Sequence, residues 1–202
     1  MMYLLTHSLL SSWLYAMRDN PYEDATTERD SYQEFLQALR KEPGEQTEAM
    51  QNGIEFENLV TDIVNGDADS EHKWYEAASK VARTVKGGWF QYKAKKELVV
   101  SGIKILLYGR LDVLKAGEII DTKFSKSYER GKYIDSTQHP VYMELIPEAD
   151  RFTYIVSNGS EVWTETYRRD ETPDVIPIIE AFLVYLMEND LWEVYTSHWA
   201  AL

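Results

Sequence analysis

The sequence predicts an α/β (α+β) fold in one domain, with a mainly helical region over residues 1–86 and a sheet-containing region over residues 87–202. Two observations lead to this prediction. Before Gly87-Gly88, apolar residues recur every three or four positions, which is the spacing of helices. After these glycines, runs of β-branched and aromatic residues dominate, and helical spacing returns only in two later segments.

Four helices are expected before the double glycine. The apolar spacing places them at Leu4–Met17, Tyr32–Leu39, Met50–Val64 and Trp74–Val85. A polar, turn-rich stretch over residues 19–30 joins the first two, and Pro43-Gly44 separates the second from the third. The fourth ends at the double glycine, where left-handed backbone costs little.

Three consecutive antiparallel strands are expected next, over residues 89–100, 103–114 and 118–124. Turn residues connect them at Ser101-Gly102 and at Lys115–Gly117. A polar, basic segment then leads to a helix from about Thr137 to Ile146, with Pro140 in its first turn. The chain finishes with a hairpin, Arg151–Ser157 and Glu161–Tyr167 around Asn158-Gly159, and a helix over Val175–Glu188.

The composition excludes several classes of protein. With 44% hydrophobic and 27% charged residues in 202, the chain has the make-up of an ordinary globular protein rather than a disordered or fibrous one. It has no cysteine, which excludes disulfides, zinc–thiolate sites, iron–sulfur clusters and thiol catalysis. Any metal ion must therefore bind oxygen or imidazole.

Residues 1–17 lack the basic leader and the small-residue cleavage site of a signal peptide. Nothing in the chain approaches the run of about 20 apolar residues that a membrane span requires. We therefore expect a cytoplasmic protein that does not enter a membrane.

Charge is strongly segregated along the chain. The net charge is −13, which by itself opposes binding to nucleic acid. Residues 77–132, however, hold thirteen Lys and Arg against five Asp and Glu, a net charge of +8, while the rest of the chain carries −21. This distribution is typical of a phosphate-binding surface on an acidic body, although a run of charge can also be a solvated face.

Asp121 and Lys123 are two residues apart in a predicted strand, so their side chains share a face. The hairpin that turns at Lys115–Gly117 brings Asp112 close to Asp121. Two neighbouring carboxylates repel each other unless a cation lies between them, and a divalent cation with oxygen ligands meets that need. An acid two residues from a lysine is also a common ion pair on exposed strands. The apolar neighbours Ile119 and Ile120 favour a buried strand, where charges need a partner or a function.

Glu57 is a second candidate for the same site. A helical wheel anchored on Ile54 places Glu57 within an apolar stripe that includes Met50, Val60 and Val64. A glutamate that faces the core requires a cation, although it can instead extend its carboxylate to solvent. Gly53, one turn earlier, is expected to let this helix approach the sheet closely.

Gln138 and Tyr142 are four residues apart and share a helical face. His139 points away from that face, so we expect a surface histidine. His7, His72 and His198 lack the spacing of metal ligands, and the pattern assigns them no role.

Four elements in order, Gly53-x-x-x-Glu57, Gly109-x-x-Asp112, Asp121-x-Lys123 and Gln138-x-x-x-Tyr142, resemble the RecB-like branch of the PD-(D/E)XK nucleases. The serine-rich stretch from His7 to Trp13 loosely resembles an N-terminal helix of that branch. The resemblance implies a restriction-endonuclease-like nuclease domain with a mixed central sheet flanked by helices. With no fused helicase motor, the chain is most similar to stand-alone phage-type exonucleases.

The resemblance also implies roles for single residues. Asp112, Asp121, Glu57 and the backbone carbonyl of Thr122 would bind Mg²⁺ or Mn²⁺, and Lys123 would orient or deprotonate the attacking water. Gln138 and Tyr142 would support the site or touch the DNA backbone. The absence of cysteine excludes the iron–sulfur cluster of several relatives. The expected partners are linear duplex or single-stranded DNA ends, with a second copy of the chain or a recombination protein as further candidates.

The basic stretch supplies candidate DNA contacts, which are Lys93, Lys95, Arg110, Lys126 and Arg130. Trp89 and Phe90 lie among these cations, where they can stack on bases or pack in the core. Two alternatives stay open. One is an acidic, non-catalytic interaction protein that mimics DNA, supported by the −21 outside the basic stretch, and the other is a degenerate nuclease that binds DNA without cutting it.

Overall fold

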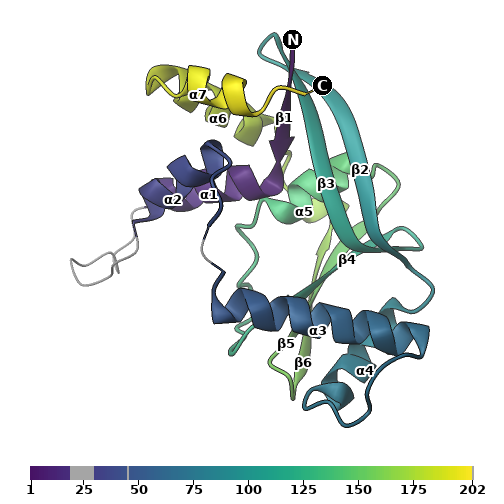
Figure 1. Ribbon diagram of the computed structural model, residues 1–202. Helices are drawn as coiled ribbons and strands as arrows, with labels where there is room; N and C mark the ends of the chain where they lie inside the picture. Colours follow the sequence, from purple (N-terminus) through teal and green to yellow (C-terminus); the bar gives the residue numbers. More distant parts are fainter. Residues whose placement is uncertain (19–29, 45, 202) are drawn as a thin grey trace.

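A mixed six-stranded sheet forms the centre of the computed structural model, which describes residues 1–18, 30–44 and 46–201 (Figure 1). Five strands run in the order β1-β3-β4-β5-β6, and β2 also pairs with β3. The parallel pairs are β1–β3 and β4–β5, and the other pairs are antiparallel. The strands are β1 (Met2–Thr6), β2 (Trp89–Val100), β3 (Ile103–Lys115), β4 (Glu118–Phe124), β5 (Arg151–Ser157) and β6 (Val162–Arg168).

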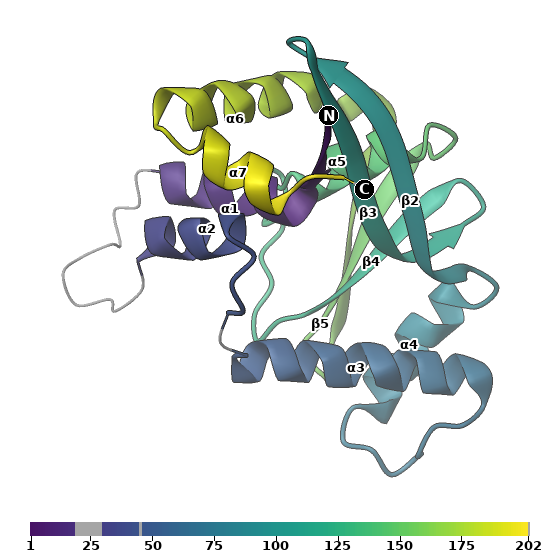
Figure 2. The same ribbon diagram turned by 45° about the horizontal axis from the view of Figure 1, so that its top comes forward.

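Helices flank this sheet, which confirms the predicted α+β fold with a mixed sheet. Figures 1 and 2 show α3 and α4 together near one end of the sheet, while α1, α2, α6 and α7 gather beside β1. None of the helices in the described residues has the length and apolar character needed to cross a membrane. The helices are α1 (His7–Met17), α2 (Ser31–Leu39), α3 (Glu48–Asn65), α4 (Tyr75–Val85), α5 (Gln138–Leu145), α6 (Ile176–Glu188) and α7 (Trp192–His198), with a 3₁₀ turn at Arg169–Glu171.

The predicted hairpins are confirmed, and their turns show why. Ser101-Gly102 and Ala116-Gly117 each place two successive residues at positive φ, which matches the twist of a two-residue hairpin. The second turn pairs Lys115 with Glu118 and Val113 with Ile120. The last hairpin turns around Asn158 and Gly159, as expected.

The start of the chain differs from the prediction. Residues 2–6 form a strand instead of the first turn of a helix, because they add to β3 in parallel with Leu4 opposite Leu106. The helix begins at His7, where the Thr6 side chain accepts a hydrogen bond from the Leu9 amide at 3.3 Å. Helix α7 was not anticipated, and the connection predicted over residues 19–30 falls almost entirely outside the described residues.

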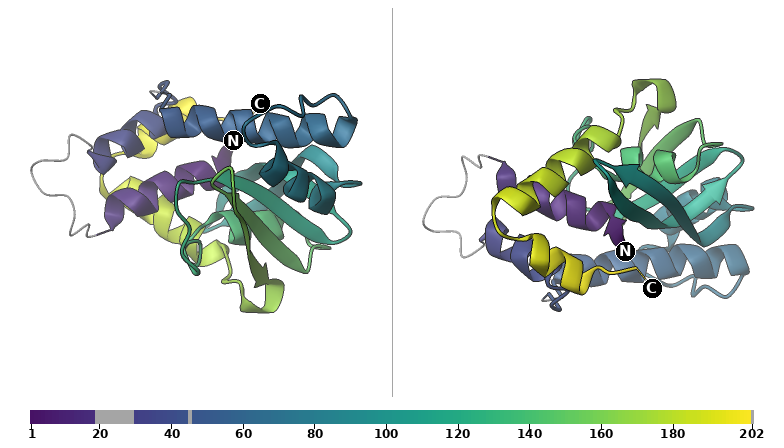
Figure 3. Two further views of the ribbon diagram at one scale, coloured as in Figure 1. Left: turned by 90° about the horizontal axis from the view of Figure 1, so that it is seen from below. Right: turned by 90° about the horizontal axis from the view of Figure 1, so that it is seen from above.

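Two apolar clusters hold the elements together. The larger includes β1, α1, α2, α5, α6 and α7, and runs in sequence from Leu5 to Trp199. The smaller joins α3 and α4 to the sheet through Val113, Ile120 and Ile155. Figure 3 shows α3 extended along one side of the molecule with α4 beside it. Both regions of the chain therefore contribute to one sheet and to its packing.

The buried face of α3 is rotated from the predicted one. Phe56, Leu59 and Val60 are buried, whereas Met50 and Ile54 are each at least half exposed. A Cβ at Gly53 would have no atom within 4 Å, so the close approach expected there is wrong. Glu57 lies beside the true apolar face and is partly buried. The Glu57 side chain therefore lies at the edge of the buried face of α3.

Gly109 is the position where backbone closeness is required. A Cβ at this residue would lie 2.6 Å from Cε1 of Tyr142 and 2.8 Å from Cδ1 of Leu145. The Tyr142 ring therefore packs directly on the backbone of β3, and its hydroxyl donates a hydrogen bond to the carbonyl of Arg110 at 3.1 Å. The glycine fixes how closely α5 approaches the sheet.

The variant Gly109→Ala should lower the free energy of unfolding by about 1–3 kcal/mol, because the added methyl group overpacks this contact. Gly53→Ala is the control, since its methyl group meets nothing and alanine favours a helix interior by about 1 kcal/mol. Urea unfolding of both variants measures the difference. Equal stability of the two would contradict the close packing of α5 on β3.

Candidate metal and phosphate site

The candidate site lies at a fork between β3 and β4. The two strands are paired from Lys115 and Glu118 to Val113 and Ile120, and no further pairs follow. Along the same edge of β3, the pairs with β1 end at Tyr108. Residues 109–112 of β3 therefore have no strand partner on that edge. On its other edge β3 pairs with β2, but Asp112 is left out of this pairing. The β2 residue at the same position, Gln91, is also unpaired and has a φ of +51°.

Asp112 and Asp121 face each other across the fork. They occupy the next opposed positions after Val113 and Ile120, which is the approach that the hairpin predicted. Oδ2 of Asp112 accepts a hydrogen bond from the Thr122 amide at 2.9 Å. The Asp112 carboxylate thus accepts the hydrogen bond that the backbone of a neighbouring strand would otherwise accept from this amide of β4.

Asp121 is 2% exposed and is held from two directions. Its Oδ1 accepts a hydrogen bond from the side-chain amide of Gln138, on α5. Its Oδ2 lies 2.7 Å from Nζ of Lys123 and accepts no well-aligned hydrogen bond from the described residues. Asp121 and Lys123 thus lie on one face of β4, and Gln138 contacts Asp121 from α5.

Burial and neighbouring carboxylates raise the pKa of Asp112 and of Glu57. Burial, followed by the charges of Asp121 and Glu57, raises the pKa of Asp112 from 3.8 to about 8. Burial and then the charge of Asp121 also raise the pKa of Glu57, while Lys123 and Arg110 oppose this shift. Glu57 of α3 therefore belongs electrostatically to the same site as the two aspartates. These effects show an excess of negative charge in the interior.

Lys123 supplies part of the balancing charge. Burial by itself would lower the pKa of its ammonium group, but the effects of Asp121, Asp112 and Tyr133 together outweigh burial and the pKa is raised. The ammonium therefore stays protonated at neutral pH.

The oxygen atoms at this site are of the kind that hard divalent cations bind. Three carboxylates and the carbonyl of Thr122 offer oxygen atoms, which Mg²⁺ and Mn²⁺ prefer. Within the described residues, no three His, Asp or Glu side chains already stand as a complete ligand set. The enclosed Oδ2 of Asp121, which accepts no well-aligned hydrogen bond from the described residues, is the oxygen that would suit such an ion.

Two histidines depart from the sequence-based expectations. His139 is 1% exposed instead of lying at the surface, because the far side of α5 packs on β5 and β6. Its ring stacks on Tyr167 at 4.3 Å, and Nδ1 lies 3.2 Å from the hydroxyl of Tyr154. Burial lowers the pKa of His139 to about 4, so the ring is neutral. It stabilises the interior behind the site.

His7, to which the pattern assigned no role, stands beside the site. Its ring meets that of Tyr142 edge to face at 5.2 Å. Burial and then the charge of Lys123 lower its pKa to about 4. The only sequence signal was its place in the serine-rich stretch before Trp13, since its spacing relative to other histidines carries no information.

The basic candidates lie around the site rather than in it. Arg110, Lys93, Lys95, Lys126 and Arg130 are all exposed. Lys93 is the cross-strand partner of Arg110. Trp89 is 66% exposed and stacks on Tyr92, whereas Phe90 packs against the smaller apolar cluster. One of the two neighbouring aromatics thus packs in the core and the other is open to solvent.

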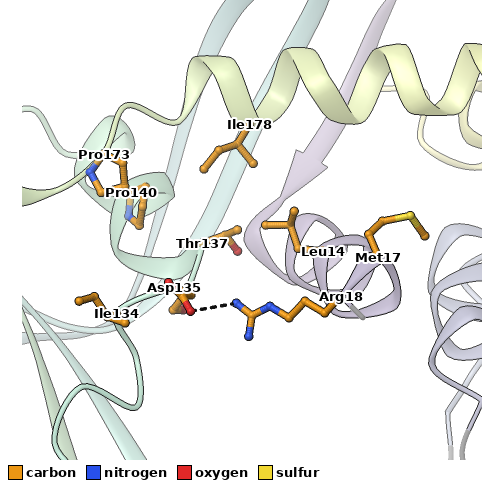
Figure 4. Close-up of a pocket in the computed structure, with 10 residues that line it drawn as sticks. Leu14, Met17, Arg18, Ile134, Asp135, Thr137, Pro140, Pro173 and Ile178 are labelled. Carbon is orange, nitrogen blue, oxygen red and sulfur yellow. Dashed lines mark ion pairs between the residues drawn. The ribbon is translucent and has the colours of Figure 1, made fainter. Parts of the chain in front are cut away.

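A pocket of 370 Å³ adjoins the site (Figure 4). Apolar side chains such as Leu14, Pro140 and Ile178 line it, and Arg18 and Asp135 form an ion pair of 3.5 Å at its rim. Thr137 connects it to the site, because its hydroxyl donates to the carbonyl of His7 at 3.2 Å. The carboxylates themselves do not line this pocket.

In metal-free buffer, Asp112→Asn should be more stable than the natural protein at about pH 9 and about equally stable near pH 3, below the ordinary pKa of an aspartate. The folded protein keeps the Asp112 proton up to about pH 8, whereas the unfolded chain loses it near 3.8. Stability from this group is therefore lost as the pH rises through that window. Each kcal/mol corresponds to about 2–4 °C in thermal unfolding. A difference that stays constant with pH would contradict the shifted pKa, and Asp62→Asn, at an exposed position of α3, is the control.

No protein-family model and no curated protein sequence matches this chain. Among solved structures, it is similar to one described as "Crystal structure of SSO0001", with a TM-score of 0.56 and 14% sequence identity. The match covers 93% of this chain and 77% of that chain. At this identity the similarity concerns the fold, and the arrangement of sheet and helices described above is one that another protein shares.

Proposed function

We propose that this protein is a divalent-metal-dependent deoxyribonuclease. The observation that carries the proposal is the pair of opposed carboxylates, Asp112 and Asp121, in a buried fork beside Glu57. Burial, followed by the charges of Asp121 and Glu57, raises the pKa of Asp112 to about 8, a cost to stability that a purely structural site would not need. A bound cation removes that cost. The order of the motifs, which resembles the RecB-like PD-(D/E)XK nucleases, supports the same reading.

Asp112, Asp121, Glu57 and the carbonyl of Thr122 would hold Mg²⁺ or Mn²⁺. Such an ion lowers the pKa of a bound water and neutralises charge on the scissile phosphate. The absence of cysteine leaves no ligand for an iron–sulfur cluster.

The reaction is hydrolysis of a phosphodiester. A water oxygen bonds to phosphorus, the bond from phosphorus to one sugar oxygen breaks, and that oxygen takes up a proton. Lys123 keeps its proton, since its pKa is raised, so it suits orientation of the water and stabilisation of negative charge better than proton abstraction. Gln138 fixes the orientation of Asp121 through its hydrogen bond.

The exposed cations around the site would bind the DNA backbone, and Trp89 is available to stack on a base. Arg110 and Lys93 are cross-strand partners on β3 and β2 and belong to this surface, and the charge of Arg110 acts on the Glu57 carboxylate. Exonuclease action, and a place in recombination or phage replication, follow from the family resemblance.

The protein should degrade linear DNA in the presence of Mn²⁺. Asp121→Asn and Lys123→Ala should each reduce the rate by about 100-fold or more, since they remove a charge next to the reacting phosphate. Asp62→Asn, at an exposed position of the same helix as Glu57, should retain full activity. Gel assays on linear and closed circular DNA measure the rates, and degradation of the linear form alone identifies an exonuclease.

If the natural protein and Asp121→Asn are equally inactive on every DNA tested, the enzyme assignment is wrong. The acidic, non-catalytic interaction protein then becomes the better account of the net charge of −13. If both proteins bind DNA without cutting it, the degenerate nuclease is favoured.

Metal binding has a readout that does not depend on activity. Mn²⁺ should raise the thermal unfolding temperature, and at 100 times its dissociation constant it adds about 2.7 kcal/mol of stability. Asp112→Asn and Glu57→Gln should lose most of this shift, because each removes one carboxylate ligand. Asp62→Asn should keep it. An equal shift in all four proteins would place the metal elsewhere.

A further inference from the structure

Glu165 is a buried carboxylate that the proposed reaction does not use. It lies on β6, is 8% exposed, and accepts hydrogen bonds from the hydroxyl of Tyr128 at 2.6 Å and the amide of Gly131 at 3.0 Å. The Tyr133 amide at 3.3 Å and the Tyr167 hydroxyl complete its surroundings. Burial would raise the pKa of Glu165, but these four donors lower it, so the group is a stable anion.

Three of the four donors come from one segment, residues 125–136, which we name the basic loop. It begins directly after β4, which ends at Phe124, and leads to α5, which begins at Gln138. The loop thus starts next to Lys123 and finishes next to Gln138, two residues that contact Asp121. Its position relative to the site is set at both ends.

Aromatic stacking orders the basic loop further. Tyr128 stacks on Trp163 of β6 at 5.6 Å, and Tyr133 stacks on Tyr154 of β5 at 4.3 Å. Charges of Lys123 and Asp121 act on the pKa of Tyr133, after burial, which places this tyrosine beside the site. The loop is therefore held against β5 and β6 without any ligand.

The outer side of the loop is positively charged and concave. Lys126, Arg130 and Lys132 are exposed, and residues 127–132 surround a hollow of 640 Å³. Two acids, Glu129 and Asp135, lie on the same loop, and Asp135 pairs with Arg18 at 3.5 Å. A concave surface with exposed cations next to a phosphate-cleaving site suits a polyanionic chain.

We propose that the basic loop is a preformed cradle for the phosphate backbone of a nucleic-acid strand, and that Glu165 is the positioning residue that fixes the cradle beside the carboxylates. The nature of the ligand rests on the proposed function. The role of Glu165 rests on its contacts alone. Because the loop is ordered in advance, binding loses less conformational entropy than it would with a flexible loop.

The test compares two isosteric substitutions that remove the same charge. Glu165→Gln replaces one carboxylate oxygen by an NH2 group that donates, so a backbone amide of the loop, that of Gly131 or that of Tyr133, loses its acceptor. Asp135→Asn removes an equal charge from an exposed side chain of the same loop. By charge alone both variants should bind a polyanion more tightly. If Glu165 positions the cradle, Glu165→Gln should bind about tenfold more weakly instead, while Asp135→Asn binds at least as tightly as the natural protein.

Binding is measured by fluorescence anisotropy with labelled oligo(dT) in EDTA at several salt concentrations. The plot of log affinity against log salt should become shallower by about 2 in Glu165→Gln, as expected when three cations lose their contacts with a single strand. Trypsin should also cut faster after Lys126, Arg130 and Lys132 in this variant. A variant that is merely less stable would lower the unfolding temperature without changing the salt slope.

A double-mutant cycle tests whether Glu165 affects binding through the cations of the basic loop. In a protein that carries Lys126→Ala, Arg130→Ala and Lys132→Ala, adding Glu165→Gln should cause no further loss of affinity, because Glu165 acts through the cations of the loop. An additive loss, or unchanged affinity in Glu165→Gln alone, would overturn the proposal. Failure of oligo(dT) to bind the natural protein would overturn the assignment of the cradle to nucleic acid.

The two proposals can fail separately. If the loop binds oligo(dT) in EDTA but the protein cleaves no DNA in Mn²⁺, the proposed nuclease activity is wrong and the proposed role of the basic loop stands. Cleavage that Glu165→Gln leaves unchanged in both KM and kcat would keep the nuclease and remove the cradle.

Discussion

The separation of β4 from β3 after a short paired segment is the constraint on which the site depends. Once the strands part, the amide of Thr122 needs an acceptor, and the Asp112 carboxylate supplies it at 2.9 Å. The same separation opens the edge of β3 so that Tyr142 can rest on Gly109 and donate to the carbonyl of Arg110. Polar groups therefore enter the interior where the sheet stops providing hydrogen bonds.

This arrangement costs stability, which the rest of the fold must offset. Carboxylates that share a buried space repel one another, and Lys123, Arg110 and the Thr122 amide offset this effect in part. The apolar clusters on either side are extensive, with Phe56 and Ile120 in one and Phe152 and Val141 in the other. Such clusters keep a folded protein above its stability threshold while a functional site remains unfavourable.

Sequence reasoning succeeded where local patterns decide the structure. The turn at Ala116-Gly117 sets the register of β3 against β4, and from that register the meeting of Asp112 with Asp121 follows. Sequence reasoning failed where the structure depends on contacts between segments far apart in the sequence. Nothing local marks residues 2–6 as a strand, because their partner is β3, about a hundred positions later. His139 is buried by β5 and β6, and Glu165 is surrounded by a loop some thirty residues earlier, so neither could be recognised from neighbouring residues.

The first strand is enclosed on both edges. Along one it pairs with β3, and along the other Trp199 and Ala201 form backbone hydrogen bonds with Leu4 and Met2 at 2.7 and 2.9 Å (Figure 1). The surroundings of residues 2–6 are therefore complete only when residues near position 200 have folded against them. Since His7 follows this strand directly and stands beside the candidate site, the order of that site depends on a contact between segments almost two hundred positions apart.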